Sequence, residues 1–361
     1  MQHKTILEFC LSPDLGGLEL FMLNCVEYFS TKTNVLTAVA PNKKLHKILT
    51  DNNIFLVKRN KLFPLIPAIQ LARFIDEKKI DIIHFHWTKD IATVVLAKVF
   101  SKRKPKIIQS RHMRMTRFKD DFYHKWLYKN IDTIHAVTHQ VKEQLEKFIP
   151  SDCRPKIEVV HPGTKVPIID EKEKESLREK YALNDSFIVG MIGRLEEAKG
   201  QYLLLEAMAN LKALNIKVLI VGQAMEAQYL EELKTKILGL GIDEKIIFTG
   251  FTKKVNAHIQ LCNLTVLATL KETFGLVVIE SMANGVPVIA TDSGGPLEII
   301  NNSIDGFFFD RTVQDLEKKI RMFYEDKSLQ NKIAKKALMH VKEMFDQETQ
   351  LTKLYKVMNE G

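Results

Sequence analysis

Apolar residues occur along this chain in two alternating kinds of segment. Short continuous runs rich in isoleucine and valine are followed by amphipathic stretches of a dozen or more residues, and the first pair is KTILEFC at 4–10 and LELFMLNCVEYFS at 18–30. Continuous rather than alternating hydrophobicity is typical of parallel strands that are buried on both faces. The pattern therefore predicts an α/β fold in which parallel strands and helices alternate.

The alternation occurs in two series separated by an interruption. Between TIHAVT at 133–138 and FIVGMIG at 187–193, residues Pro162, Gly163 and Pro167 break the pattern, and a charge-rich helical stretch follows. With 361 residues, this predicts two domains, each an open doubly wound sheet, joined by a linker near 162–170. The other strands are expected at 34–40, 80–86, 106–110, 217–222, 245–250, 264–269 and 286–291.

The composition narrows the class of protein. A chain with 45% hydrophobic and 27% charged residues can bury a full core. No apolar run reaches the roughly 20 residues that cross a bilayer, and Glu8 interrupts the apolar run at the N-terminus, so we expect neither a membrane span nor a signal peptide. The cysteines form no CxxC pair, which is typical of reduced thiols in a cytoplasm: Cys10, Cys25, Cys153 and Cys262.

The positive charge is concentrated in the first half of the chain. Residues 1–165 hold 28 lysines and arginines against 16 acidic residues, whereas the remainder holds 25 against 28. The densest part, residues 98–119, includes Arg114, Arg117 and Lys119. A local positive field indicates an anionic partner, which is a nucleic acid, an anionic lipid surface or a phosphorylated substrate. A solvated face that only aids solubility is the alternative.

Residues just after the strands are the candidates for chemistry, because ligands of open α/β sheets bind at the carboxyl ends of the strands. Gly16 and Gly17 follow the first strand. They tolerate positive φ and close approach of a ligand, and a helix starting near Leu18 would point its N–H groups at a phosphate. A simple tight turn is the alternative, and the GxGxxG spacing of dinucleotide sites is absent.

Three histidines follow strands of the first domain. His84 and His86 share one face of a strand and suit a metal, but the sequence places no third ligand beside them. We therefore expect His86 to line a cleft between the domains. His112, after the strand at 106–110, is expected to line the same cleft, and a purely structural hydrogen bond is its alternative.

The second domain has two cations at a strand end. Arg194 and Lys199 lie on either side of a short turn after the strand at 187–193. A planar guanidinium and an ammonium that converge there are able to hold a diphosphate. Surface pairs with Glu196 and Glu197 are the alternative.

Two carboxylates, Glu272 and Glu280, lie eight positions apart around a predicted helix start near Phe274. One carboxylate in the loop and one in the helix would bind hydroxyls at two ends of a ligand, and the helix N-terminal amides would hold its charged middle. This describes a sugar nucleotide. A capping Glu272 and a solvated Glu280 are the alternative.

Together these segments resemble a known family. GGLE at 16–19, GRLEEAKG at 193–200 and ETFGLVVIESMANGVPVIATDSGGPLEII at 272–300 are similar to the signature blocks of the retaining glycosyltransferases of family 4, also called group 1. The resemblance spans nearly the whole chain and includes HPG at 161–163 and FDQETQLTKLYKVM at 345–358. Thr273 departs from it, because a glycine is frequent at that position.

The resemblance implies the glycosyltransferase B fold, in which two Rossmann-like, doubly wound parallel-sheet domains face a cleft. Its C-terminal helix crosses back onto the first domain. The implied domains are an N-terminal acceptor-binding domain of residues 1–165 plus about 346–361, and a C-terminal nucleotide-sugar-binding domain of residues 166–345.

The resemblance also implies a role for each candidate residue. Catalysis would involve Glu272 at the donor sugar, His112 beside that sugar, and Arg194 and Lys199 at the diphosphate. Glu280 would bind the ribose. The remaining donor contacts would come from backbone groups of Gly16, Gly17, Phe274, Gly275 and Leu276. The acceptor or membrane side would comprise His86, Arg114, Arg117 and Lys119.

The implied reaction is retaining transfer of a hexose-type sugar from a UDP- or GDP-sugar to a glycan or an anionic lipid-linked acceptor, without a metal, cofactor or enzyme nucleophile. Bacterial lipopolysaccharide or surface polysaccharide synthesis is the expected setting, in the cytoplasm or peripherally at the cytoplasmic face of the inner membrane. We expect no nucleic-acid partner, since no RNA-binding signature with interleaved aromatic residues is present. Two alternatives stay open: a sugar-nucleotide epimerase of the same fold, and a non-catalytic basic protein that binds a membrane surface. The donor sugar, the acceptor and the oligomeric state are not fixed by the sequence.

Overall fold

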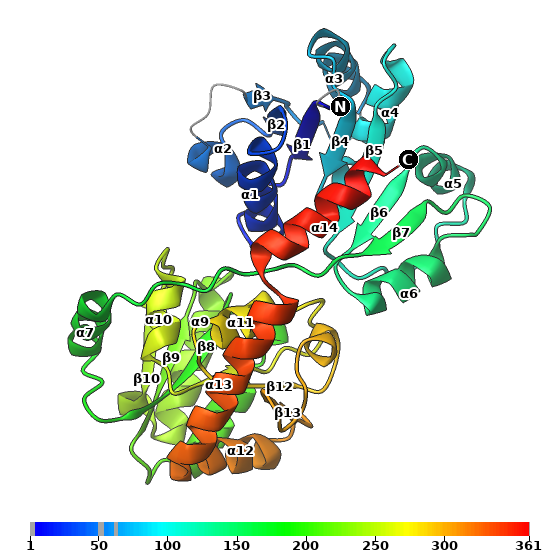
Figure 1. Ribbon diagram of the computed structural model, residues 1–361. Helices are drawn as coiled ribbons and strands as arrows, with labels where there is room; N and C mark the ends of the chain where they lie inside the picture. Colours follow the sequence, from blue (N-terminus) through cyan, green and yellow to red (C-terminus); the bar gives the residue numbers. More distant parts are fainter. Residues whose placement is uncertain (1–3, 50–53, 61–63, 361) are drawn as a thin grey trace. The chain divides into compact units, whose positions relative to one another are not determined.

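The computed structural model describes residues 4–49, 54–60 and 64–360, and the chain divides into two compact units. Unit 1 comprises Met1–Pro162 and Glu348–Gly361, and unit 2 comprises Gly163–Gln347. Both units are built of parallel strands and helices, as the hydrophobic pattern predicts, and each is considered by itself (Figure 1).

Unit 1 contains a seven-stranded parallel sheet in the order β3-β2-β1-β4-β5-β6-β7. The order reverses between β1 and β4, and loops that follow such neighbouring strands diverge and leave room for ligands. The strands are β1 (Ile6–Cys10), β2 (Val35–Val39), β3 (Ile54–Leu56), β4 (Ile82–Phe85), β5 (Lys106–Arg111), β6 (Thr133–Ala136) and β7 (Lys156–Val159). Its helices are α1 (Gly17–Ser30), α2 (Lys44–Ile48), α3 (Leu65–Glu77), α4 (Ile91–Phe100), α5 (Phe122–Lys129), α6 (His139–Phe148) and α14 (Gln347–Asn359), with a 3₁₀ turn η1 (Thr88–Asp90).

Unit 2 contains a six-stranded parallel sheet in the order β10-β9-β8-β11-β12-β13, which reverses between β8 and β11. The strands are β8 (Phe187–Ile192), β9 (Ile216–Val221), β10 (Ile246–Gly250), β11 (Leu264–Leu267), β12 (Val288–Thr291) and β13 (Phe307–Phe309). Its helices are α7 (Glu171–Lys180), α8 (Gln201–Asn210), α9 (Ala227–Leu240), α10 (Val255–Leu261), α11 (Leu276–Ala283), α12 (Val313–Glu325) and α13 (Lys327–Met344). Short 3₁₀ turns are η2 (Glu197–Lys199), η3 (Asp243–Lys245) and η4 (Gly295–Glu298).

The hydrophobic pattern predicted every central strand but not β3, β7 and β13. These three strands have three or four residues each, lie at sheet edges and are only partly buried. An edge strand has a neighbour on one side only and needs no continuous apolar run, so its sequence carries a weaker signal.

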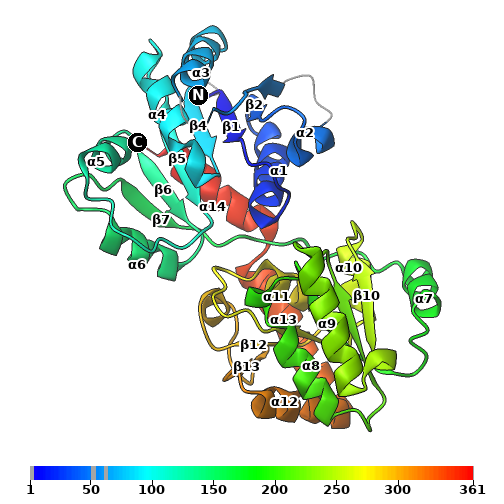
Figure 2. The same ribbon diagram turned by 180° about the vertical axis from the view of Figure 1, so that it is seen from behind.

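Helices α1 and α14 cover one face of the unit 1 sheet. Phe21 and Phe29 of α1 and Leu354 of α14 pack against Ile6 of β1 and Ile108 of β5. Figures 1 and 2 show α14, at the C-terminal end of the chain, lying across this sheet. Helix α4 packs against β4 and β5, and α3 packs against α4.

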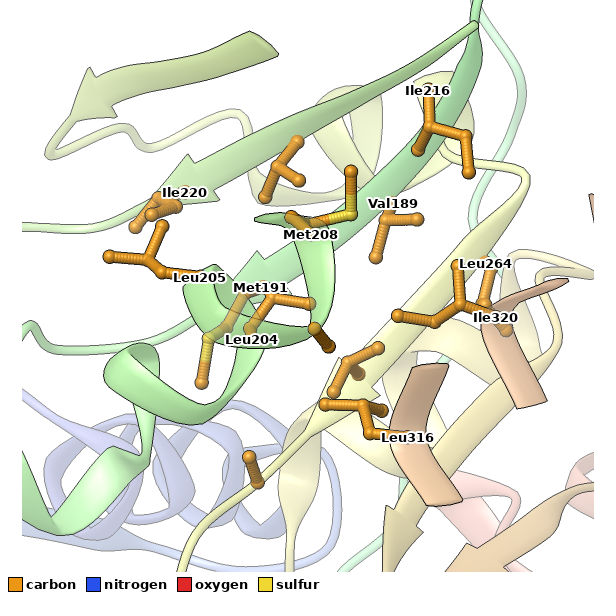
Figure 3. Packing of buried hydrophobic residues seen from close by; sticks show 14 of the residues in the cluster. Val189, Met191, Leu204, Leu205, Met208, Ile216, Ile220, Leu264, Leu316 and Ile320 are labelled. Carbon is orange, nitrogen blue, oxygen red and sulfur yellow. The ribbon is translucent and has the colours of Figure 1, made fainter. Parts of the chain in front are cut away.

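Both faces of the unit 2 sheet are buried. Val189 and Met191 of β8 point into the larger cluster with α8 and α12, as Figure 3 shows, whereas the alternate residue Ile188 packs with Ile259 of α10. Burying such a side chain contributes about 1.5–3 kcal/mol each. The continuous apolar strands are explained by this burial on two faces. The cluster also includes Leu204, Leu205, Met208, Ile216, Ile220, Leu264, Leu316 and Ile320.

Two expectations from composition concern the whole chain. Across residues 4–49, 54–60 and 64–360, no helix is both long and apolar enough to cross a membrane. The four cysteines are all buried and unpaired.

Candidate active site

The loop between β11 and α11 carries Glu272, and it meets the loop after β8. Glu272 Oε2 accepts a hydrogen bond from Lys199 Nζ at 3.0 Å, and Oε1 accepts one from the Thr273 N–H at 3.2 Å. Lys199 ends the 3₁₀ turn η2 that follows β8. Because β8 and β11 are the strands at the reversal of the sheet, their loops place a cation and a carboxylate side by side at its carboxyl edge.

A glycine pair after β12 holds the Glu272 loop in place. The Gly295 N–H donates to the Glu272 carbonyl at 3.2 Å. A Cβ atom on Gly294 would overlap that carbonyl oxygen, and one on Gly295 would overlap the backbone of Phe274. Gly294 also has a φ of +72°. Only glycine permits this approach, and the strand pattern alone did not single out either residue.

Helix α11 begins at Leu276, close to the predicted start near Phe274. Gly275 is its N-cap with a left-handed φ of +97°, and no side chain caps the helix. The first amides of a helix lack intrahelical acceptors and favour an anion. Phe274 has a buried side chain and therefore offers a ligand only backbone groups.

Glu280 lies in the second turn of α11 and is partly buried. In the part of the chain that the structure describes, its carboxylate has no hydrogen-bond or ion-pair partner, and burial raises its pKa. A partly buried carboxylate without a partner loses solvation that nothing replaces. The arrangement is better suited to a ligand hydroxyl than to the solvated role that was the alternative.

Arg194 differs from Lys199 in its surroundings. Its Nη2 lies 3.2 Å from Glu196 Oε1 and its side chain is 59% exposed, so the surface pair considered as an alternative is present. The Arg194 carbonyl accepts a hydrogen bond from the buried Gln201 side chain at 3.1 Å, and Gln201 also accepts one from Tyr229. Gln201 and Tyr229 thus hold the strand end in place, and no motif in the sequence indicated this role.

In unit 1, Gly16 is the N-cap of α1, and the tolerance of glycine for positive φ is not used there. Gly16 has a φ of −151°, and Gly17 is not among the glycines with positive φ. The Gly16 N–H donates to Glu19 Oε2 at 2.8 Å. The carboxylate of Glu19 thus already satisfies this amide, and binding of a phosphate by Gly16 and Gly17 stays a prediction.

The expectation that His86 lines a cleft is also wrong, because His86 is fully buried. Its Nε2 lies 2.7 Å from Glu8 Oε2. The neighbouring His84 is equally buried, and its ligand atoms with those of Glu8 and Cys25 form a group compact enough to hold a metal ion. Sequence reasoning missed Glu8, whose signal was a carboxylate inside an otherwise apolar strand.

His112 follows β5 and is partly buried. Its ring lies 4.9 Å from Phe21 and 5.8 Å from His86. Burial lowers the pKa of His112 well below its usual value, so the imidazole is neutral. Within the described ranges, its Nε2 is buried without a partner.

The loop after β5 is shaped by a buried arginine that the sequence did not distinguish from its basic neighbours. Arg111 donates from Nε to the Met113 carbonyl at 2.8 Å, from Nη1 to Thr88 Oγ1 at 2.7 Å, and from Nη2 to the Arg114 carbonyl at 3.1 Å. The same loop carries the exposed Arg117 and the partly buried Lys119. The predicted acceptor-side cations therefore lie on one organised loop.

Four exposed apolar side chains accompany these cations. The exposed fractions of Met113, Phe118, Phe122 and Tyr123 are 58%, 57%, 87% and 51%. Clusters of exposed apolar side chains mark interaction surfaces more often than isolated ones do. We call residues 113–123 the basic–aromatic segment.

Comparisons with known proteins match both halves of the chain. The family model described as glycosyl transferases group 1 matches residues 173–339, and the one described as Glycosyltransferase Family 4 matches residues 15–166. The N-acetyl-alpha-D-glucosaminyl L-malate synthase of Bacillus anthracis is 24% identical over 87% of this chain and 83% of its own length. A capsular polysaccharide biosynthesis glycosyltransferase of Staphylococcus aureus is 27% identical over 49% of this chain and 47% of its own. The crystal structure of Anabaena Alr3699/HepE in complex with UDP and glucose has a TM-score of 0.87 at 20% identity, covering 99% of this chain and 100% of that one.

Proposed function

Because this chain belongs to the group 1 glycosyltransferases of family 4, we propose that it moves a hexose-type sugar from a nucleoside-diphosphate sugar to a glycan or lipid-linked acceptor, with retention of anomeric configuration. We place this reaction in bacterial surface polysaccharide or lipopolysaccharide synthesis. The relative that acts in capsular polysaccharide biosynthesis and the UDP and glucose bound by the Anabaena protein support this proposal.

The partnerless carboxylate of Glu280 carries the donor assignment. Two neighbouring ribose hydroxyls would give it the hydrogen bonds that the described residues do not supply. Glu272, already oriented by Lys199, would accept from hydroxyls of the transferred sugar.

The diphosphate leaving group develops negative charge as the bond to the sugar breaks. Lys199, Arg194 and the N-terminal amides of α11 would stabilise that charge more in the transition state than in the ground state. Arg194 would exchange its surface partner Glu196 for phosphate oxygens. These cations would take the place of a metal ion, and a donor phosphate oxygen would accept the proton of the acceptor hydroxyl, so we assign no protein nucleophile.

A thermal-shift screen with UDP-, GDP-, ADP- and CMP-sugars tests the donor site. We expect one nucleotide class to stabilise the protein, since a ligand at 100 times its Kd adds about 2.7 kcal/mol. Glu280→Gln should weaken that binding by about 1.5–3 kcal/mol, the value of hydrogen bonds to a charged group.

Glu325→Gln is the matched control, because Glu325 is an exposed carboxylate at the end of α12 in the same unit. It should bind as the wild type does. Absence of a shift with every nucleotide sugar, or equal weakening by both substitutions, would contradict the donor assignment. Donor turnover without any acceptor would instead favour the epimerase.

The basic–aromatic segment supports an acceptor at an anionic membrane surface. Aromatic side chains settle at the level of lipid headgroups, and each nearby cation adds about 1 kcal/mol of attraction to an anionic leaflet. Phe122, 87% exposed, follows Arg117 and Lys119 in the sequence of this segment. We therefore propose that unit 1 docks peripherally on such a membrane.

Sedimentation of the full chain with phosphatidylglycerol or phosphatidylcholine vesicles tests this docking. We expect binding to the anionic vesicles alone, weakened by salt and by Phe122→Ser. Leu238→Ser on α9 is the control, because Leu238 is an exposed apolar residue of unit 2. Equal binding to both vesicles without salt dependence would contradict the proposal.

A further inference from the structure

A continuous chain of buried polar groups crosses the unit 1 sheet beneath α1. Glu8 Oε1 lies 2.9 Å from His84 Nδ1, His84 Nε2 lies 2.7 Å from Ser110 Oγ, and Ser110 Oγ lies 2.6 Å from His135 Nδ1. His135 Nε2 then lies 2.7 Å from the Val160 carbonyl oxygen. The side chains of Glu8, His84, Ser110 and His135 are all 0% exposed and come from β1, β4, β5 and β6.

The proton count of this chain does not balance with neutral histidines. Its two ends, the Glu8 carboxylate and the Val160 carbonyl, only accept hydrogen bonds. Four hydrogen bonds need four protons, whereas Ser110 and two neutral imidazoles supply three. Because an unmade hydrogen bond between buried groups is costly, the chain should hold one additional proton.

The surroundings indicate where that proton lies. Burial would raise the pKa of Glu8, but His84 and His86 hold it below its usual value, so the carboxylate is ionised. Burial lowers the pKa of His135 to about 3, so this imidazole is neutral. It donates from Nε2 to Val160 and accepts from Ser110, which in turn accepts from His84. His84 must therefore donate from both ring nitrogens.

We infer that unit 1 holds His84 as an imidazolium ion against the carboxylate of Glu8, and that this buried ion pair is a positioning device which fixes the tautomer of His86. Glu8 Oε2 accepts from His86 Nε2 at 2.7 Å, which leaves His86 Nδ1 as the bare acceptor nitrogen. Within the described residues that nitrogen is buried without a partner, as is Nε2 of His112.

The consequence for catalysis passes through His112. The rings of His86 and His112 lie 5.8 Å apart in a stacked arrangement, and an unprotonated His86 Nδ1 is able to accept a hydrogen bond through one water that bridges it to the His112 N–H. Glu8 and His84 would thus set the orientation of His112. This link rests on the proposed role of His112 at the donor sugar, whereas the ion pair itself does not.

The other groups that face the chain do not supply the missing proton. On β1 and α1, burial raises the pKa values of Cys10 and Cys25 well above the usual thiol value, so both stay neutral. Helix α14 packs Leu351, Leu354 and Met358 into the same hydrophobic cluster as Phe21 and Phe29 of α1, and these side chains carry no ionisable group. Burial lowers the pKa of His86 to about 4, so it too is neutral.

A metal ion is the rival explanation for Glu8, Cys25 and His84 lying together. Both ring nitrogens of His84 and both oxygens of Glu8 already take part in hydrogen bonds. Metal binding would break the chain at its Glu8 end. Metal analysis of the purified full-length protein separates the two readings, and stoichiometric zinc that resists dialysis would overturn the ion pair.

Nitrogen-15 NMR of the histidine rings in the full-length protein tests the inference. At pH 8, well above the ordinary histidine pKa of about 6.5, we expect His84 to show two protonated nitrogens and His86 to show a proton on Nε2 only. A neutral His84 at pH 8, or a His86 protonated on Nδ1, would overturn the proposal. This measurement needs no variant and no substrate.

Two substitutions sharpen the test. Glu8→Gln removes the charge but keeps the shape, and we expect it to abolish the imidazolium signature of His84 and to shift the ring signals of both His86 and His112. Ser110→Ala leaves the Glu8 carboxylate in place but removes the partner of His84 Nε2 and of His135 Nδ1, so the tautomer of His86 should persist while the ring signals of His84 and His135 shift. Unchanged His86 and His112 signals in a folded Glu8→Gln would show that Glu8 has no positioning role.

The test of the ion pair and the test of the proposed donor site can fail independently of each other. An imidazolium at His84 in a protein that binds no nucleotide sugar would leave the ion pair standing and contradict the donor assignment. A protein that binds a nucleotide sugar but has a neutral His84 at pH 8 would support the donor assignment and overturn the ion pair.

Discussion

The two units share one strand order but place their ionisable side chains differently. In unit 1, the central strands bury Glu8, His84 and His135 beneath a covering helix. In unit 2, the strands β8, β11 and β12 read FIVGMI, LTVL and VIAT and contain no ionisable residue, and the carboxylates lie in the loop and helix beyond β11. Unit 1 carries 29 lysines and arginines against 18 acidic residues, and unit 2 carries 24 against 26.

Because of this difference, we expect ionisable groups to affect folding stability mainly in unit 1 and ligand binding mainly in unit 2. A buried ionisable group makes folding depend on its protonation state, whereas a group at a loop is stabilised by water until a ligand replaces that water. Substitutions at the unit 2 loops should therefore affect activity with little effect on folding. Acid should affect the folding of unit 1 first.

The largest effect is expected from Lys199→Ala. In the proposed function Lys199 stabilises leaving-group charge, so its removal should lower kcat/KM about 10²–10³-fold, equivalent to about 2.7–4 kcal/mol, in assays with the donor that the thermal-shift screen identifies. Folding stability should change by no more than about 1 kcal/mol, since Lys199 and Glu272 are a partly exposed pair.

Lys234→Ala is its control, because Lys234 forms an exposed pair with Glu231 on α9 at 2.8 Å. It should leave both quantities unchanged. A Lys199→Ala protein that keeps its activity but unfolds much more easily would contradict the contrast between the units. The pair of Lys199 and Glu272 would then stabilise the fold of unit 2.

Acid sensitivity of unit 1 is the next largest effect. The pKa values of His86 and His135, lowered to about 4 and about 3, keep both neutral in the folded state, whereas the unfolded chain takes up protons below about 6.5. Stability therefore falls as the pH drops from 6.5 to 4. Asp90, whose pKa is raised to about 7 by burial, acts in the opposite sense between pH 7 and 3.8. His112, whose pKa burial also lowers, adds to the loss, so the net loss should be at least about 1.4 kcal/mol per pH unit.

Tryptophan fluorescence provides the measurement, because both tryptophans, Trp87 and Trp126, lie in unit 1. When the pH is lowered from 7 to 5, the midpoint of urea unfolding measured by tryptophan fluorescence should move to a lower urea concentration. If unit 1 unfolds first, the later part of the transition in far-UV circular dichroism reports unit 2. The midpoint of that part should move less. Equal shifts of both signals would mean that the buried histidines do not distinguish the units.

The smallest effect is expected from Gly294→Ala. The residue has a positive φ and no room for a Cβ against the Glu272 carbonyl, so the substitution should destabilise unit 2 by about 1–3 kcal/mol. It should also weaken donor binding by displacing Glu272. Circular dichroism should record the change while the tryptophan transition stays in place.

Gly239→Ala is the matched control on α9, where an added Cβ meets no atom within 4 Å. Alanine there should stabilise the helix by up to about 1 kcal/mol. Equal destabilisation by both substitutions would show that the approach of Gly294 to Glu272 is not what holds this loop.

Much of the candidate site in unit 2 could be predicted from sequence because its parts are local. Glu272, Gly275 and Glu280 fall within one loop and helix start, and the hydrophobic pattern that predicts β11 and α11 also places these residues at a strand end. The partner of Lys199 was not predicted, because that contact spans 73 positions.

The sequence by itself determined two series of alternating strands and helices and the residue types at their carboxyl ends, since hydrophobic periodicity and glycine placement act over a few neighbouring residues. Only the tertiary structure decided that Glu8 meets His84, 76 positions away, that His86 is buried, and that Glu280 is left without a partner. Hydrogen bonding and burial depend on which strands become neighbours in the sheet. That choice is made by packing of the whole unit and is not recorded in any short segment.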